Sequence, residues 1–217
     1  MEPLEVTMRR ILAPLLAALS AALLLVLAAP GAHADDPVPT PPPTPPTTTT
    51  PAPVEPYARY EPQTTCSPTA KPGAVAAQRW AVATYGGRAG GISRACGGSL
   101  SEHKEGRAFD WTLDARKVAD RARAQRYLTA LFATGPTGER AELARRMGVM
   151  YVIWNDRMYA AYRQFAPTAY VSSSCRGKPL TRCSATLRHR DHVHVSLSKA
   201  GGAGRTSWYV GRVARAR

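Results

Sequence analysis

The chain has 217 residues, and its 29 Lys and Arg against 15 Asp and Glu give a formal net charge of +14 at pH 7. This excess predicts attraction to polyanions. The basic residues are scattered rather than interleaved with aromatic residues, which argues against a specific nucleic-acid-binding surface.

The N-terminal segment, residues 1–34, has the pattern of a signal peptide. Arg9 and Arg10 precede an apolar run over 11–29, and residues 32–34 (AHA) form a small-x-small cleavage site. The alternative is an uncleaved membrane anchor, because the apolar run is about long enough to span a bilayer. Under either interpretation the rest of the chain lies outside the cytoplasm, so we expect a secreted protein associated with the cell wall.

Residues 35–65 are dominated by Pro and Thr, most densely over 40–51 (TPPPTPPTTTTP). Proline fixes φ and removes backbone donors, so this composition predicts a disordered, extended linker. The remaining residues, 66–217, have the size of one ordinary domain and can bury a hydrophobic core.

All four cysteines lie in this domain. Export, the even count and the lack of a CxxC pair favour two disulfides over a metal cluster, with three possible connectivities. We expect Cys66–Cys96 and Cys175–Cys183, because each of these pairs closes a short loop.

Hydrophobic periodicity and turn residues divide the domain into short elements. Asp114 is a candidate N-cap for the second of three helices. In chain order, the expected elements are helix 71–85, loop 85–100, strand 108–113, helix 115–133, helix 139–147, strand 149–154, a turn at 155–156 into 157–162, polar loop 163–188 and strand 191–197. The sum is an α+β fold with a small antiparallel sheet, flanking helices on one side and disulfide staples.

Two short segments carry candidate chemistry. Six residues separate His103 from Asp110, and Gly106 between them permits a sharp chain reversal. In the strand over 191–197, His192 and His194 project to one face because side chains alternate with period two. Three of the five histidines crowd residues 189–194, and imidazole and carboxylate groups are zinc ligands.

The pattern Ser-x-His-x-x-Gly-x-Ala-x-Asp over residues 101–110 resembles the first signature of zinc D-Ala-D-Ala metallopeptidases. The pair His192-x-His194 resembles the second signature of the wider lysostaphin, D-Ala-D-Ala peptidase and hedgehog superfamily. The segment also resembles a domain found at the C-terminus of many secreted actinobacterial proteins. The resemblance implies that a zinc ion is bound by His103, Asp110 and His194.

The resemblance also implies the catalytic groups. The D-Ala-D-Ala metallopeptidases use a Glu three residues before the last zinc His, where this chain has the shorter Asp191. The hedgehog-like and lysostaphin-like branches place the first His of the pair beside the metal, which here is His192. We rank His192 above Asp191 as the general base or transition-state donor. An upstream arginine stabilises the developing oxyanion in the family, and Arg88 is our choice.

We therefore expect a secreted, monomeric zinc metallopeptidase that hydrolyses peptidoglycan stem peptides as a D,D-carboxypeptidase or endopeptidase. Anionic wall polymers are further expected partners. The first alternative is a catalytically inactive zinc-containing wall-binding module, and the second is a structural protein without metal. Trp111 and Trp154 are expected in the sheet core or along a cleft, and Ser101 is expected to brace the His103 loop.

Overall fold

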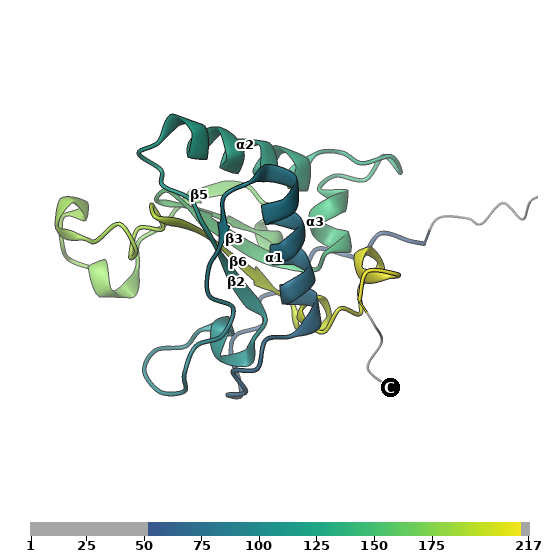
Figure 1. Cartoon of the computed structure of the whole chain (residues 1–217), viewed down its shortest axis with the longest axis horizontal. Helices are drawn as coiled ribbons and strands as arrows, with labels where there is room; N and C mark the ends of the chain where they lie inside the picture. Colours follow the sequence, from purple (N-terminus) through teal and green to yellow (C-terminus); the bar gives the residue numbers. More distant parts are fainter. Residues whose placement is uncertain (1–51, 214–217) are drawn as a thin grey trace, which may run out of the picture. The chain divides into compact units, whose positions relative to one another are not determined.

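The computed structural model describes residues 52–213, so the expected signal peptide and most of the expected linker lie outside the described residues. Within this range the chain forms a six-stranded antiparallel sheet in the order β1-β2-β6-β3-β4-β5 (Figure 1). The strands are β1 (Arg88–Ala89), β2 (Ala108–Thr112), β3 (Val149–Trp154), β4 (Arg157–Ala160), β5 (Pro167–Ala169) and β6 (His192–Leu197).

Over residues 52–213, four α-helices and five short 3-10 helices accompany these strands, which confirms the expected disulfide-stapled α+β class. Between residues 52 and 213, no helix is long and apolar enough to cross a membrane. The helices are α1 (Pro72–Tyr85), α2 (Val118–Phe132), α3 (Glu142–Arg146), α4 (Lys199–Gly202), η1 (Glu102–Glu105), η2 (Ala161–Arg163), η3 (Ser173–Cys175), η4 (Leu180–Arg182) and η5 (Ser207–Tyr209).

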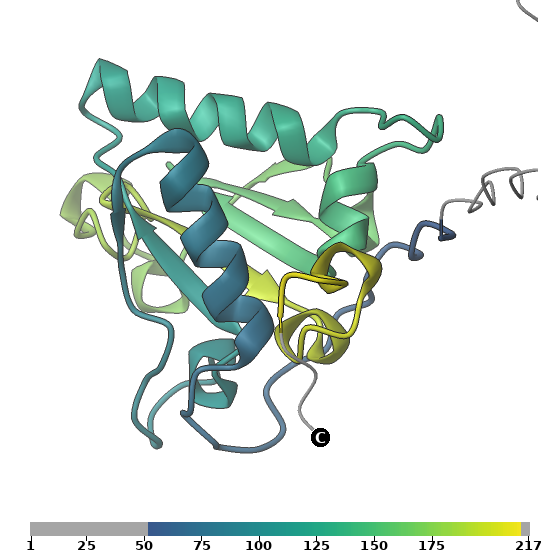
Figure 2. The same cartoon turned by 45° about the vertical axis from the view of Figure 1, so that its right-hand side comes forward.

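The two faces of the sheet have different roles. Helices α1, α2 and α3 cover one face, as Figures 1 and 2 show, and residues from all three join the main hydrophobic core. Val193 and Val195 of β6 point into this core and are fully buried, whereas His192 and His194 alternate with them and point to the opposite face. Each large apolar side chain buried in the core contributes about 1.5–3 kcal/mol. The hydrophobic core therefore lies on the helix-covered face of the sheet and supports the strands that carry the histidines on the other face.

Helix α1 forms where it is predicted. Pro72 occupies its first turn, where the missing N–H removes no helical hydrogen bond. Ala74, Ala77 and Ala81 recur at helical spacing and are fully buried, so α1 packs closely on the sheet. Gly86, at φ 80°, ends the helix.

Helix α2 begins later than predicted. Its N-cap is Lys117 rather than Asp114, and the helix starts at Val118 instead of residue 115. The Asp114 carboxylate instead accepts hydrogen bonds from the backbone N and the side chain of Arg116. Aspartate side chains often form such local turns in competition with helix formation. Here the turn forms, and the helix begins after it.

Helix α3 is also shorter than the predicted range of 139–147. The Glu142 carboxylate accepts hydrogen bonds from the backbone N and Oγ1 of Thr137 and pairs with Arg146. These bonds fix the start of the helix against the preceding loop, so residues 139–141 remain outside it.

Residues 52–65 form an extended segment that we call the N-terminal strap. The sequence places this segment in the disordered linker, but it contacts the domain along its length. The Glu55 carboxylate accepts hydrogen bonds from the backbone N and Oγ of Ser207. The backbone N of Thr64 donates to Glu105 Oε1 at 3.0 Å. The described part of the expected linker is therefore attached to the domain by hydrogen bonds that its backbone donates and that Glu55 accepts.

The predicted disulfides are both present. Cys66 bonds Cys96 across 30 residues and ties the chain before α1 to the loop before η1. Cys175 bonds Cys183 across 8 residues and closes the loop between β5 and β6. In the loop-entropy description, a loop of the first size stabilises the folded state by about 3–4 kcal/mol.

Candidate metal centre

Three separate elements bring the expected ligands together. His103 lies on η1, Asp110 on β2 and His194 on β6, where Asp110 and His194 are directly paired across the ladder. Gly106 ends η1 in the left-handed region, at φ 63°. A Cβ atom there would lie 1.9 Å from the carbonyl oxygen of Thr69, so only glycine allows the chain to turn from His103 into β2.

The ligand atoms converge closely on the sheet face opposite helices α1, α2 and α3, which we call the open face. His103 Nε2 lies 3.2 Å from Asp110 Oδ1 and 3.1 Å from His194 Nδ1. His194 Nδ1 lies 3.1 Å from the same Asp110 oxygen. The two histidines are buried, at 1% and 7% exposed. The group His103, Asp110 and His194 could hold one metal ion.

Hydrogen bonds fix which ring nitrogens are free to bind a metal. His103 Nδ1 lies 2.9 Å from the carbonyl oxygen of Ile92, which can only accept, so Nδ1 carries the proton and Nε2 a lone pair. His194 Nε2 lies 2.9 Å from Ser196 Oγ, whose hydroxyl donates to the Glu102 carboxylate. The serine oxygen therefore accepts from His194 Nε2, and His194 Nδ1 carries a lone pair.

Three electron-rich atoms thus face one another within 3.2 Å: two imidazole lone pairs and one carboxylate oxygen. Such a cluster is repulsive by itself and is favourable around a cation. Nitrogen and carboxylate ligands at this spacing fit a transition-metal or zinc ion better than magnesium or calcium, which prefer all-oxygen sites. The donor set of the described residues therefore fits the expected metal.

Burial and neighbouring groups favour the ligand forms of these side chains. Burial alone would raise the pKa of Asp110, but the neighbouring His103 and His194 side chains hold this pKa well below its usual range. Burial lowers the pKa of His194, against the opposing effect of Asp110. Asp110 is therefore ionised and His194 neutral at pH 7, as metal binding requires.

His192 and Asp191 form a pair beside the ligands. His192 Nδ1 donates to Asp191 Oδ1 at 2.7 Å, and His192 Nε2 lies 3.7 Å from Asp110 Oδ1. The second oxygen of Asp191 accepts a hydrogen bond from Thr186 Oγ1 at 2.5 Å. Asp191 is thus bonded to His192 and Thr186 rather than to the ligands, and it aims the free Nε2 of His192 toward the cluster.

Arg88, the expected oxyanion-binding residue, lies on the short strand β1. It is paired with Thr112 of β2, and Thr112 is paired in turn with His192 of β6. Directly paired residues project to the same face of an antiparallel sheet, so Arg88 shares the open face with the ligands. Its side chain is exposed two strands away from His192.

The remaining expected residues have structural positions. Trp111 and Trp154, at 0% and 6% exposed, belong to the main core on the helix-covered face rather than to a cleft. Among the described residues, Ser101 braces the His103 loop through backbone hydrogen bonds and not through its hydroxyl group. Its N donates to Gln63 Oε1 at 2.8 Å, and its carbonyl oxygen accepts from the N of Lys104 at 2.9 Å.

Sequence reasoning missed two buried polar side chains at the site. Gln78 of α1 is 7% exposed, and its Nε2 donates to the carbonyl oxygens of Gly90 and Asp110, both at 2.9 Å. Glu102 is 5% exposed and lies next to the first ligand. A glutamine on the alanine-rich buried face of a predicted helix is a usable signal, whereas nothing in the pattern around His103 marks Glu102 as buried.

His189 adds a further ring to the site. Its centroid lies 4.7 Å from that of His192 and 5.6 Å from that of His194. Its backbone adopts φ 50°, and its carbonyl oxygen accepts from the N of Asn155 at 2.7 Å. Burial, followed by repulsion between His189 and the neighbouring His194 and His192 when these rings are protonated, lowers the pKa of His189 to about 2. His189 is therefore a neutral wall of the site at pH 7.

Residues 66–177 match the sequence model of a family described as the VldE C-terminal domain. This match covers slightly more than half of the chain, contains His103 and Asp110, and ends before His194. No curated protein and no solved structure matches the chain. The chain belongs to the VldE C-terminal domain family.

Proposed function

We propose that this protein is a secreted zinc-dependent peptidase that hydrolyses peptide bonds in peptidoglycan stem peptides. The observation that carries the proposal is the convergence of His103 Nε2, Asp110 Oδ1 and His194 Nδ1 within 3.2 Å, with the tautomer of each ring set by its other nitrogen. Two nitrogen ligands and one carboxylate are the donor set of catalytic zinc sites.

The side chains around these ligands supply the parts that hydrolysis needs. Zinc bound there would lower the pKa of a water molecule and polarise the scissile carbonyl. His192, with Nδ1 bonded to Asp191, presents its Nε2 lone pair and can take the proton of an attacking water. Arg88 lies on the same face and supplies positive charge for the developing oxyanion.

The substrate class rests on three features. The two signature blocks resemble those of D-Ala-D-Ala metallopeptidases. The N-terminal segment resembles an export signal, and two disulfides fit an oxidising compartment. The net charge of +14 would concentrate the protein near anionic wall polymers. A D,D-carboxypeptidase or an endopeptidase both satisfy these features.

The second candidate is a zinc-containing wall-binding module without turnover. Asp191 favours it, because this carboxylate is bonded to Thr186 and His192 and is not aimed at the ligands, unlike the glutamate expected from the resemblance. The two candidates differ in whether the Asp191–His192 pair is sufficient as a base.

Incubation of the purified full chain with isolated peptidoglycan sacculi separates the candidates. We expect release of D-alanine or of muropeptide fragments, abolished by a chelator and restored by added zinc. His192→Ala should retain zinc and lose product release. Zinc binding without any product from wild-type protein would refute the peptidase and favour the binding module.

A further inference from the structure

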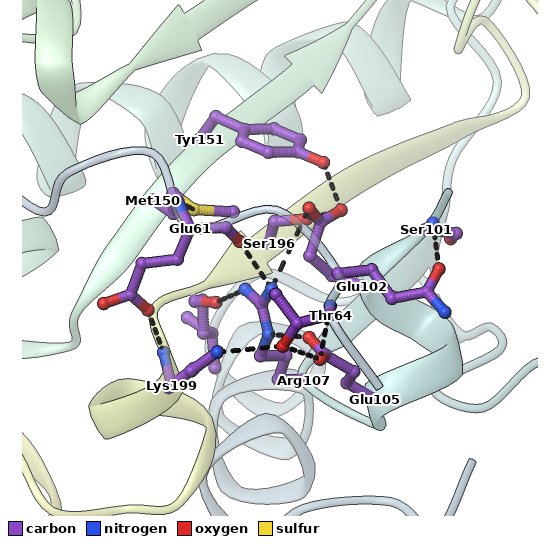
Figure 3. Close-up of polar contacts among 12 residues, drawn as sticks. Glu61, Thr64, Ser101, Glu102, Glu105, Arg107, Met150, Tyr151, Ser196 and Lys199 are labelled. Carbon is purple, nitrogen blue, oxygen red and sulfur yellow. Dashed lines mark hydrogen bonds and ion pairs between the residues drawn. The ribbon is translucent and has the colours of Figure 1, made fainter. Parts of the chain in front are cut away.

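Glu102 is a buried carboxylate that the proposed chemistry does not use directly. It is 5% exposed, and two hydroxyl groups point at one of its oxygens, as Figure 3 shows. Tyr151 OH donates to Glu102 Oε2 at 2.5 Å, and Ser196 Oγ donates to the same oxygen at 3.3 Å. A buried carboxylate is costly to desolvate, so its position calls for a specific role.

The hydrogen bonds of Glu102 continue to the last ligand. Ser196 is fully buried, and its oxygen accepts from His194 Nε2 at 2.9 Å. Tyr151 stacks on the His194 ring, with centroids 5.6 Å apart. Ser196 therefore contacts the edge of the His194 ring, and Tyr151 contacts its face. Both residues donate a hydrogen bond to Glu102.

We propose that Glu102 is a positioning residue, which acts through Ser196 to keep His194 in the tautomer whose Nδ1 faces the metal. Because the glutamate accepts the serine proton, the serine oxygen must accept from Nε2, and Nδ1 is left unprotonated. The inference deepens the proposed function and rests on its metal site.

The position of Glu102 in the chain links two ligands. Glu102 precedes His103 on η1, so one short helix carries the first ligand and the group that orients the third. Arg107 anchors this helix: its Nε donates to Glu105 Oε2 at 2.7 Å, and its Nη2 donates to the Glu61 carbonyl oxygen of the strap at 2.5 Å. Figure 3 shows this anchor on the opposite side of Glu102 from Tyr151. One short helix therefore supports both ligands.

Groups that orient metal-bound histidines typically change metal affinity 10- to 100-fold when they are removed. We expect Glu102→Gln and Ser196→Ala each to weaken zinc binding within this range. Both residues act through one chain of hydrogen bonds. The double variant should therefore lose little more zinc affinity than the single variant with the larger loss.

The matched control is Glu105→Gln. Glu105 is also 5% exposed, lies on the same 3-10 helix and accepts several hydrogen bonds, but none of the groups that donate to it is bonded to a ligand. Its substitution should lower the stability of the protein and change zinc affinity less than about threefold, well short of the loss expected for orienting groups.

The experiment uses the full chain and zinc alone, with affinity measured by competition against a fluorescent chelator. Cobalt(II) absorption spectra report ligand geometry, and urea unfolding of the metal-free proteins reports stability. We expect Glu102→Gln and Ser196→Ala to weaken zinc binding and shift the cobalt bands, and Glu105→Gln to do neither.

Equal zinc affinity in wild type and Ser196→Ala would overturn the positioning role while leaving the metal site intact. Additive losses in the double variant, or an equal loss in Glu105→Gln, would overturn it as well. Zinc binding without hydrolysis of sacculi would remove the proposed peptidase activity and leave the positioning role supported. Failure of the wild type to bind zinc would overturn both.

Discussion

Glu105→Gln tests the attachment of the strap to the ligand-bearing helix. The Glu105 carboxylate accepts from the backbone N atoms of Thr64 and Thr65, both at 3.0 Å, and from Arg107 Nε at 2.7 Å. Burial alone would raise its pKa, but the bonds from Thr64, Arg107 and Thr65 lower this pKa to about 2. An unfolded chain binds that proton near pH 4.5.

The sign of the pH dependence follows from this lowered pKa. The ionised carboxylate stabilises the folded state fully above about pH 4.5, and this contribution is lost as the pH falls toward 2. A lowering of this size corresponds to at most about 3.4 kcal/mol. Hydrogen bonds to a charged acceptor contribute about 1.5–3 kcal/mol, so a loss of about 2–3 kcal/mol is expected. The variant should therefore be less stable than wild type by about 2–3 kcal/mol at pH 7, with the difference shrinking below pH 4.5.

Urea unfolding followed by tryptophan fluorescence measures this difference, with both proteins compared at pH 7, 5, 4 and 3. Contributions from the other carboxylates cancel in the comparison. A difference that stays constant between pH 7 and pH 3 would refute the role of the ionised carboxylate. A difference below about 0.5 kcal/mol at pH 7 would show that the strap is not held through Glu105, since such a value is normal for an ordinary surface substitution.

Three further changes probe the site and its support. Gly106→Ala places a Cβ atom 1.9 Å from the Thr69 carbonyl oxygen at φ 63°, so we expect a loss of more than about 2 kcal/mol in urea unfolding together with weaker zinc binding; wild-type values for both would contradict the tight reversal. His192→Ala should keep one zinc per chain by elemental analysis while product release from sacculi falls at least 100-fold, in line with general-base catalysis; retained activity would exclude His192 as the base. Deletion of residues 52–65 from the chain removes the bonds to Glu105 and Ser207, so we expect a lower unfolding midpoint. An unchanged midpoint would mean that the strap contributes no stability.

Local patterns were sufficient to predict much of the fold. The alanine-rich, apolar periodicity of α1 is a local signal, and the alternation over residues 191–197 separates core valines from outward histidines. The disulfide pairs follow from short loop closure. Gly106 predicts the reversal after His103 because a left-handed residue is needed there.

Features that depend on distant partners were not predictable in the same way. Residues 52–65 of the strap form no helix or strand, and the attachment of the strap depends on Glu105 and Ser207, far away in the sequence. The sequence around Glu102 is typical of an ordinary charged residue. Its role depends on Tyr151 of β3 and Ser196 of β6, which contact it only in the folded structure. Asp114 has the right residue type for a cap, but its bond to the nearby Arg116 backbone forms a turn instead.

Metal content tests the central claim most directly. The full chain and its His194→Ala variant would be purified in parallel, equilibrated with zinc, freed of loosely bound ions and measured by plasma mass spectrometry. We expect about one zinc per wild-type chain and loss of that zinc in the variant, since a site of three protein ligands does not survive removal of one. Wild-type protein without bound zinc, or equal zinc in both proteins, would contradict the site formed by His103, Asp110 and His194.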